Sequence, residues 1–116
     1  MYEEHTLATG RVVHIRPLPY DQFEEIEDLR LKQMEESVRL YEENKPTRGS
    51  MVVLALERDV RRRKLDACVQ DFDTLRADMS IADVRQIEGI IDRVSFAEAV
   101  RENLSEAGDG PATTSE

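Results

Sequence analysis

Aromatic residues are scarce in this chain. It has no tryptophan, three tyrosines and three phenylalanines, so aromatic residues make up only 5% of the sequence, while 35% of it is charged. A core made from this composition must be mostly aliphatic and thin. At 116 residues the chain can still bury one modest core. Chains of this kind often complete their burial by oligomerising or by binding a partner.

Cysteine and long apolar runs are also nearly missing. The single cysteine, Cys68, has no second cysteine with which to form an internal disulfide, which fits a reducing compartment. The longest apolar run, 51–56, is far too short to span a bilayer. The polar N-terminal residues have neither the basic nor the apolar part of a secretory signal. We therefore expect a cytoplasmic protein without membrane contact.

Positive charge is in the minority. The 16 lysines and arginines against 25 aspartates and glutamates give a net charge of -9, whereas nucleic-acid-binding domains are usually basic. The exception is the basic run 61–64. Four consecutive residues on a helix point in different directions, so they form no single basic face. We expect these side chains to pair with acidic faces of the first helix or of a partner, and we expect no nucleic-acid contact.

Recognisable catalytic and metal-binding patterns are absent from the sequence. It has no phosphate-binding loop, no dinucleotide fingerprint and no zinc-ligand spacing. The only histidines, His5 and His14, lack further ligands at a recognisable spacing. Cys68 lies in an apolar stripe without a nearby histidine, which is typical of a small buried hydrophobe. The residues therefore predict no enzymatic activity, no cofactor and no metal site.

A β-hairpin is predicted at the start of the chain. Residues 3–7 and 11–16 are the two strands, and the second is rich in β-branched residues. Pro17 and Pro19 then make a corner, because each proline fixes its own φ and biases the preceding residue towards extended conformations.

Two loop lengths are compatible with this hairpin. A two-residue loop would place His5 opposite His14. A three-residue loop, 8–10, would place His5 opposite Val13 and would put Gly10 where a positive φ is needed. We favour the three-residue loop because it also places three apolar residues on one face, which must then pack on a helix or on a neighbouring subunit. These are Leu7, Val13 and Ile15.

Helical patterns follow from residue 20 almost to the end. The first helix is predicted at 20–43, and a break rich in turn-forming residues follows at 44–49. The second helix is predicted to begin with Ser50 as its N-cap and to run towards Asp78.

The third helix has the clearest start signal. Ser80 followed by Asp83 is close to a capping box. Ser95 and Glu98 repeat this pattern, which leaves two possibilities open. Either a short fourth helix covers 96–107, or the third helix continues through this segment.

Each predicted helix carries an apolar stripe. In the first helix it consists of Phe23, Met34, Val38 and Tyr41, with Ile26 and Leu31 at its borders. In the second helix it consists of Leu65, Cys68, Val69, Phe72, Leu75 and Met79. In the third helix it consists of Ile81, Val84, Ile87, Ile91 and Val94.

Some apolar residues lie outside these stripes. Two leucines of the first helix lie nearer its opposite side, and the first half of the second helix is apolar all round. We interpret this surplus as a surface for binding a partner helix. Its residues are Leu29, Leu40, Met51, Val52, Val53, Leu54 and Leu56.

Together these patterns predict a mainly α (α+β) fold. An N-terminal β-hairpin and proline corner, 2–18, precede a three- or four-helix bundle, 20–107, and both belong to a single domain, 1–107. The Gly-Asp-Gly-Pro sequence at 108–111 stops the last helix, and 108–116 is expected to be a disordered C-terminal tail.

The segment 7–18, L-A-T-G-R-V-V-H-I-R-P-L, resembles the start of the tail assembly chaperones of long-tailed bacteriophages. Those proteins often open with a leucine, a glycine turn, a β-branched strand and an Ile-Arg-Pro-Leu or similar exit. A helix with an early aromatic residue or leucine follows, as Phe23 does here. The segment 78–84, D-M-S-I-A-D-V, is similar to a capped helix start near their end. Pro19 departs from the threonine or serine often found at that position.

The resemblance implies a function in virion assembly. Such proteins are viral chaperones without enzymatic activity. They coat the long helical tape measure protein, keep it soluble, help to recruit tail tube subunits and are absent from the finished particle. The implied partners are therefore the tape measure protein and the tail tube protein, with a homo-oligomer as a further possibility, in the host cell cytoplasm. The alternatives are a structural tail or connector subunit retained in the particle, or a small regulatory adaptor.

Overall fold

The computed structural model of the chain describes residues 1–107, with side chains as far as residue 96. The predicted disordered tail, 108–116, lies outside the described residues. The elements in chain order are β1 (Glu3–Thr6), β2 (Val12–Ile15), α1 (Tyr20–Glu42), α2 (Pro46–Cys68), α3 (Phe72–Leu75), the 3-10 helix η1 (Arg76–Asp78) and α4 (Ile81–Ala107). The predicted fold class is confirmed: an N-terminal antiparallel hairpin precedes four α-helices.

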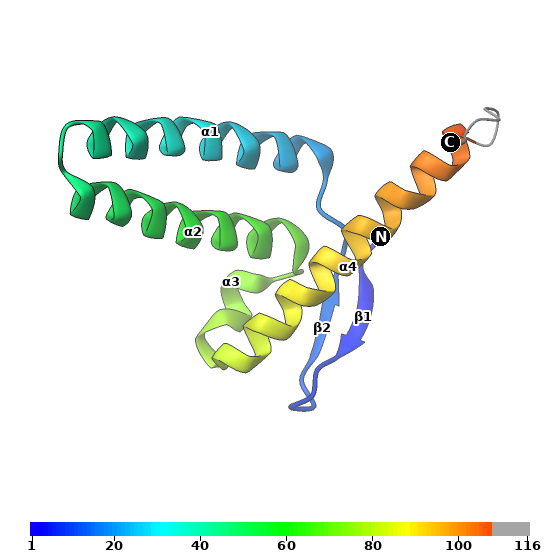
Figure 1. The fold of residues 1–116 in the computed structure, drawn as a ribbon. Helices are drawn as coiled ribbons and strands as arrows, with labels where there is room; N and C mark the ends of the chain where they lie inside the picture. Colours follow the sequence, from blue (N-terminus) through cyan, green and yellow to red (C-terminus); the bar gives the residue numbers. More distant parts are fainter. Residues whose placement is uncertain (108–116) are drawn as a thin grey trace.

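The elements form an arm and a core (Figure 1). The arm is the long antiparallel pair of α1 and α2. The core gathers the β-hairpin, the C-terminal end of α2, α3 and α4 at one end of the arm. The molecule is accordingly flat and extended, with principal dimensions of 51 × 45 × 22 Å. Helix α2 belongs to both parts, because its first half faces α1 and its last turns enter the core.

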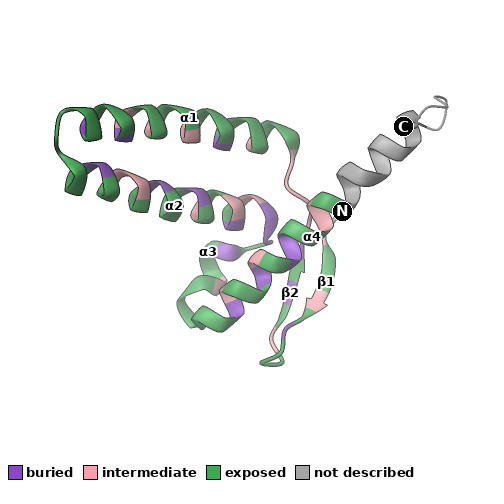
Figure 2. Ribbon diagram, in the orientation of Figure 1, coloured by how far each residue is buried: buried purple, intermediate pink, exposed green. Residues whose placement is uncertain are grey.

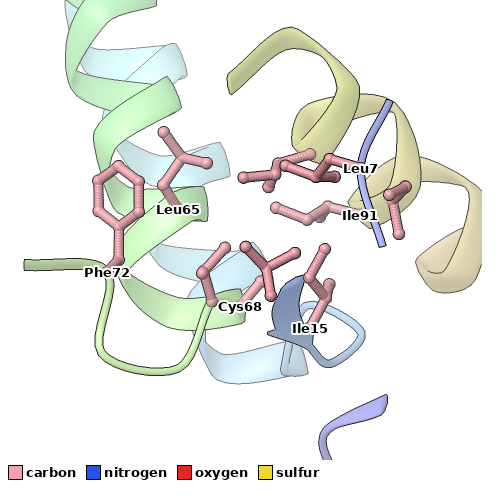
Figure 3. Packing of buried hydrophobic residues seen from close by; sticks show 10 residues of the cluster. Leu7, Ile15, Leu65, Cys68, Phe72 and Ile91 are labelled. Atoms are coloured by element: carbon pink, nitrogen blue, oxygen red, sulfur yellow. The ribbon is translucent and has the colours of Figure 1, made fainter. Parts of the chain in front are cut away.

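The core is mostly aliphatic, as the composition predicts. Side chains from the hairpin, the end of α2 and α4 meet around the fully buried Cys68, and one phenylalanine closes the cluster (Figure 3). Its buried residues are Leu7, Val13, Ile15, Leu65, Cys68, Val69, Phe72, Ile87, Ile90 and Ile91. The prediction that Leu7, Val13 and Ile15 share the face that packs is therefore confirmed.

The hairpin has the register of the three-residue loop. His5 lies opposite Val13, and the amide of Leu7 donates a 2.8 Å hydrogen bond to the carbonyl of Arg11. Gly10 has a φ of 92°, a conformation that glycine adopts without steric cost. The strands are slightly shorter than predicted, but the pairing and the choice of faces are confirmed.

The hairpin loop is tied to the start of α4. The hydroxyl of Thr9 donates a 2.6 Å hydrogen bond to the carboxylate of Asp83, and the amide of Ala8 donates one of 2.9 Å to the side chain of Gln86. Asp83 also accepts from the amide of Ser80, whose hydroxyl accepts from the amide of Asp83. The predicted capping box is confirmed, and its carboxylate additionally anchors the hairpin.

Helix α2 ends ten residues earlier than predicted. The sequence predicts that it runs towards Asp78, but the chain becomes extended at Val69, which forms an isolated β-bridge with Ile15. The carbonyl of Cys68 accepts a 2.9 Å hydrogen bond from the amide of Arg16. Asp71 then takes a left-handed conformation, with a φ of 57°, before α3 begins. Pairing with β2, a contact distant in sequence, therefore overrides the local helical pattern.

The start of α2 is also corrected. The predicted break is present but covers only 43–45, and the predicted N-cap Ser50 is wrong, because α2 begins at Pro46. Proline is well suited to the first position of a helix, where its missing N–H has no partner to lose. The actual turn is shorter and contains Asn44, whose φ is 63°.

Helix α4 is continuous, so the third predicted helix continues and no separate fourth helix starts at Ser95. The hydroxyl of Ser95 instead accepts a 2.9 Å hydrogen bond from the amide of Leu18, in the segment between β2 and α1. The predicted stripe is right for Ile87 and Ile91. It is wrong for Ile81, which is 77% exposed, and it omits the buried Ile90.

Candidate functional site

The contact between α1 and α2 is narrow and only partly apolar. Its buried apolar side chains are Ile26, Leu40, Leu56 and Val60. Ser37 is also buried there, and its hydroxyl donates a 3.0 Å hydrogen bond to the carbonyl of Gly49. Figure 2 shows burial along the facing sides of the two helices and exposure over the rest of α1.

The helices approach closely at Gly49. A methyl group added to this glycine would lie 2.7 Å from the ring of Tyr41 and 3.2 Å from the carbonyl oxygen of Ser37. The hydroxyl of Tyr41 lies 2.6 Å from that of Ser50, which holds the ring over the glycine. The contact between α1 and α2, which we call the seam of the arm, therefore depends on Gly49, a residue without a side chain.

The most apolar face of α1 lies outside this seam. Successive helical residues turn by about 100°, which places the middle of the stripe about 100° away from the middle of the seam, with Tyr41 at the border between the two. Its side chains are between 42% and 73% exposed. We call this surface the α1 stripe, and it consists of Tyr20, Phe23, Leu31, Met34, Val38 and Tyr41.

The predicted partner-binding residues differ widely in exposure in the structure. Leu40 and Leu56 are 6% and 2% exposed, so the interpretation of these two as spare apolar surface is corrected. Leu29 packs beside them against the seam. Val52 and Val53 are half-buried. Only Met51 and Leu54 are clearly exposed, at 62% and 70%.

Sequence reasoning took the α1 stripe to be the main packing face of the helix and so did not propose it as a binding site. A signal was present: Leu31, Met34, Val38 and Tyr41 repeat with spacings of three, four and three, which is the spacing of a helix-pairing seam. The sequence did not reveal that α2 packs against the neighbouring, more polar face.

A cleft lies at the base of the arm, where the α1 stripe meets the core. It has a volume of about 230 Å³ and lies between α1, α2, α4 and the segment before α1. Its apolar lining consists of Leu18, Phe23, Ile26, Val60 and Ile91. Small-molecule sites usually measure about 300–1,000 Å³. This cleft is smaller and suits a single apolar side chain better than a cofactor.

Acidic residues accompany the α1 stripe. One of them, Glu27, interrupts the stripe between Phe23 and Leu31. Four others are exposed along its outer border, namely Glu24, Asp28, Glu35 and Glu42. Within residues 1–96, none of these five carboxylates has an ion-pair partner within 4.0 Å. The border of the stripe is therefore strongly negative.

The basic run 61–64 is paired with carboxylates in several directions, but only Arg63 pairs with the first helix as predicted. The pairs are Arg61 with Glu88, Arg62 with Asp66 and Asp73, Arg63 with Glu25, and Lys64 with Asp92. The nitrogen–oxygen distances lie between 2.6 and 3.1 Å. These pairs link α2 with α1, α4 and the segment at α3, so the run joins the arm to the core and presents no separate basic face.

The candidate metal and nucleophile residues are apart from one another. His5 and His14 lie on opposite faces of the hairpin, and the described part of the chain contains no group of three potential metal ligands. Cys68 is fully buried, and this burial raises the pKa of its thiol to about 11. The prediction that it packs as a small hydrophobe is confirmed.

Comparisons with protein-family models, curated proteins and solved structures found no match to this chain. Among the described residues, no helix combines the length and apolarity needed to cross a membrane.

Proposed function

We propose that this chain is a non-catalytic chaperone of phage tail assembly, which holds an amphipathic helix of the tape measure protein against the α1 stripe. The observation that supports a helix-binding function is the row of large apolar side chains exposed along one face of α1. Exposed apolar patches of this kind mark interaction surfaces. The resemblance of 7–18 to tail assembly chaperones supplies the class of client.

The form of the stripe suits a helical client. From Phe23 to Tyr41 it extends over about 27 Å, at a rise of about 1.5 Å per residue. Amphipathic helices dock through side chains at spacings of three and four, and residues 31–41 of the stripe have the same spacing. The net charge of -9 would keep an assembly of many such chains soluble.

The magnitude of one contact can be stated. Burying a large apolar side chain contributes about 1.5–3 kcal/mol. Leu31 is 73% exposed, so a client that covers it would gain about 1–2 kcal/mol. Leu31→Asp should therefore weaken client binding by about tenfold or more.

The test is co-expression of this chain with a tape measure protein from the same genome, followed by affinity capture and light scattering of the eluate. We expect the client to become soluble and to co-elute with this chain. Leu31→Asp should reduce the amount of client that co-elutes, in line with this loss of affinity. Ile81→Asp is the matched control, because Ile81 is 77% exposed but lies on α4 rather than on the stripe.

Two results would count against the proposal. If the client remains insoluble while this chain elutes alone, the chaperone function is wrong. If peptides of this chain are found at stoichiometric amounts in purified particles, the chain is a retained tail or connector subunit.

A further inference from the structure

The charges around the α1 stripe restrict what can cover it. We propose that the occupant is a basic amphipathic helix, with lysines or arginines beside its apolar face on the side that meets the acidic border, and one of them opposite Glu27. This inference rests on the proposed function, because it specifies the chemistry of the helix that the stripe holds.

Helix α1 carries far more negative than positive charge. The helix has eight acidic residues and three basic ones. Two of the three basic residues are already engaged, since Arg30 pairs with Glu57, and Arg39 pairs with carboxylates within its own turn. The acidic border of the stripe has no such partners within residues 1–96. The third basic residue, Lys32, stands one turn from Asp28 and Glu35 without an ion pair to either within 4.0 Å, so an incoming helix meets an excess of carboxylates.

A second copy of this chain is a poor occupant for the same reason. An antiparallel pair of α1 stripes brings one acidic border against the other, and a parallel pair in register brings Glu27 against its own copy. Like charges beside a helix-pairing seam oppose association, whereas opposite charges there select the partner. The stripe therefore discriminates against its own copies and in favour of a basic helix.

Glu27 makes the requirement more specific. It stands within the stripe, between Phe23 and Leu31, so a helix that covers these two residues also covers the carboxylate. A carboxylate removed from water without a partner is strongly unfavourable. A lysine or arginine of the occupant opposite Glu27 removes this penalty.

The cleft at the base of the arm defines one end of the docked helix. Phe23 belongs both to the stripe and to the cleft wall, so the two surfaces are continuous. Four further apolar side chains line the cleft, which has room for one side chain. We expect the occupant to place a leucine, methionine or phenylalanine there, next to the basic residue that faces Glu27.

The experiment uses the full chain and three labelled helical peptides of about 20 residues, which is long enough to cover the stripe. All three share one apolar face and differ only beside it, where they carry lysine, glutamine or glutamate. Binding is measured by fluorescence anisotropy. We expect the lysine peptide to bind about tenfold more tightly than the glutamine peptide and the glutamate peptide to bind most weakly. Added salt should narrow these differences.

Charge reversal on the protein provides the matched comparison. Glu27→Lys should weaken binding of the lysine peptide at least tenfold and improve binding of the glutamate peptide. Glu4→Lys makes the same change of charge on the exposed side of β1 and should leave the order of the peptides unchanged. Helical circular dichroism checks that both variants are folded.

The outcomes separate the two proposals. Equal affinity for all three peptides overturns the charge inference and leaves helix binding in place. No binding of any peptide overturns both. A stable dimer that Leu31→Asp dissociates overturns the inference in favour of a second copy.

Discussion

Replacing Gly49 by alanine tests the close approach on which the arm depends. Alanine in a helix interior is favoured over glycine by about 1 kcal/mol. At Gly49, however, the added methyl group would lie 2.7 Å from the ring of Tyr41 and 3.2 Å from the backbone oxygen of Ser37. Forcing extra volume into a packed contact costs about 1–3 kcal/mol. We therefore expect Gly49→Ala to be neutral or to destabilise the protein by up to about 2 kcal/mol.

Gly89→Ala is the matched control. Gly89 is exposed in α4, and a methyl group there would meet nothing within 4 Å. This substitution should stabilise the protein by about 1 kcal/mol, because only the helical preference changes. Since that preference is common to both substitutions, the difference between them isolates the cost of the overlap, which is about 1–3 kcal/mol.

Urea unfolding followed by helical circular dichroism measures both effects. In a second measurement, thermal unfolding, a change of 1 kcal/mol in the free energy of unfolding should move the midpoint by about 4 °C in a chain of this size. Adding Tyr41→Ala to Gly49→Ala should recover part of the loss, because the ring is the nearer obstacle. If Gly49→Ala stabilises the protein as much as Gly89→Ala does, the approach of the two helices imposes no steric restriction and the reasoning is refuted.

Three further predictions concern the core and its links to the arm. The hydroxyl of Thr9 and the amide of Ser80 hold the pKa of Asp83 below its ordinary value, so the stability that this carboxylate contributes is present above the ordinary pKa and lost as the pH falls through the lowered one. Asp83→Asn should accordingly lower the free energy of unfolding at neutral pH. Urea unfolding at several pH values should show the free energies of the variant and the wild type converging at pH values below the ordinary pKa of the carboxylate. A difference in free energy that is constant with pH would contradict this role. Cys68 is fully buried with its thiol pKa raised to about 11, so it should react with a thiol reagent at mildly alkaline pH only after unfolding, and rapid labelling of the folded chain would contradict the packing. Arg63→Gln removes the exposed ion pair to Glu25 and should lower the free energy of unfolding by less than about 1 kcal/mol, whereas a larger loss would show that the pair is more than a surface contact.

The parts of the fold that local chemistry specifies could be predicted from the sequence. The register of the hairpin followed from Gly10, which suits the positive φ of the third loop position. The start of α4 followed from the reciprocal bonds that Ser80 and Asp83 can form. In each case the deciding interaction lies within a few residues along the chain.

The end of α2 could not be predicted in this way. Residues 69–78 have a good helical pattern, but Val69 pairs with Ile15, and the amide of Gln70 donates to the carbonyl of His14. These partners are more than fifty residues away, and a pattern read within one segment gives no indication of them. The apolar pattern of residues 69–78 was still interpreted correctly, since Val69 and Phe72 are buried in the core.

The candidate site was missed for a different reason. Apolar periodicity identifies the face of α1 that is most favourable to cover, but it does not say whether the covering element belongs to the same chain. In the arm, Gly49 and the bond from Ser37 let α2 approach a more polar face closely. The most apolar face is consequently left for another molecule.

The two parts of the molecule differ in how far along the chain their contacts reach. The hydrogen bonds that attach the hairpin and its corner to η1 and α4 join residues 67 to 78 positions apart. Those between the two helices of the arm join residues 9 to 38 positions apart. Local contacts form faster than distant ones, and synthesis proceeds from the N-terminus. The arm can therefore assemble on the ribosome while α4 is still being made, so that the α1 stripe is complete before the core has closed.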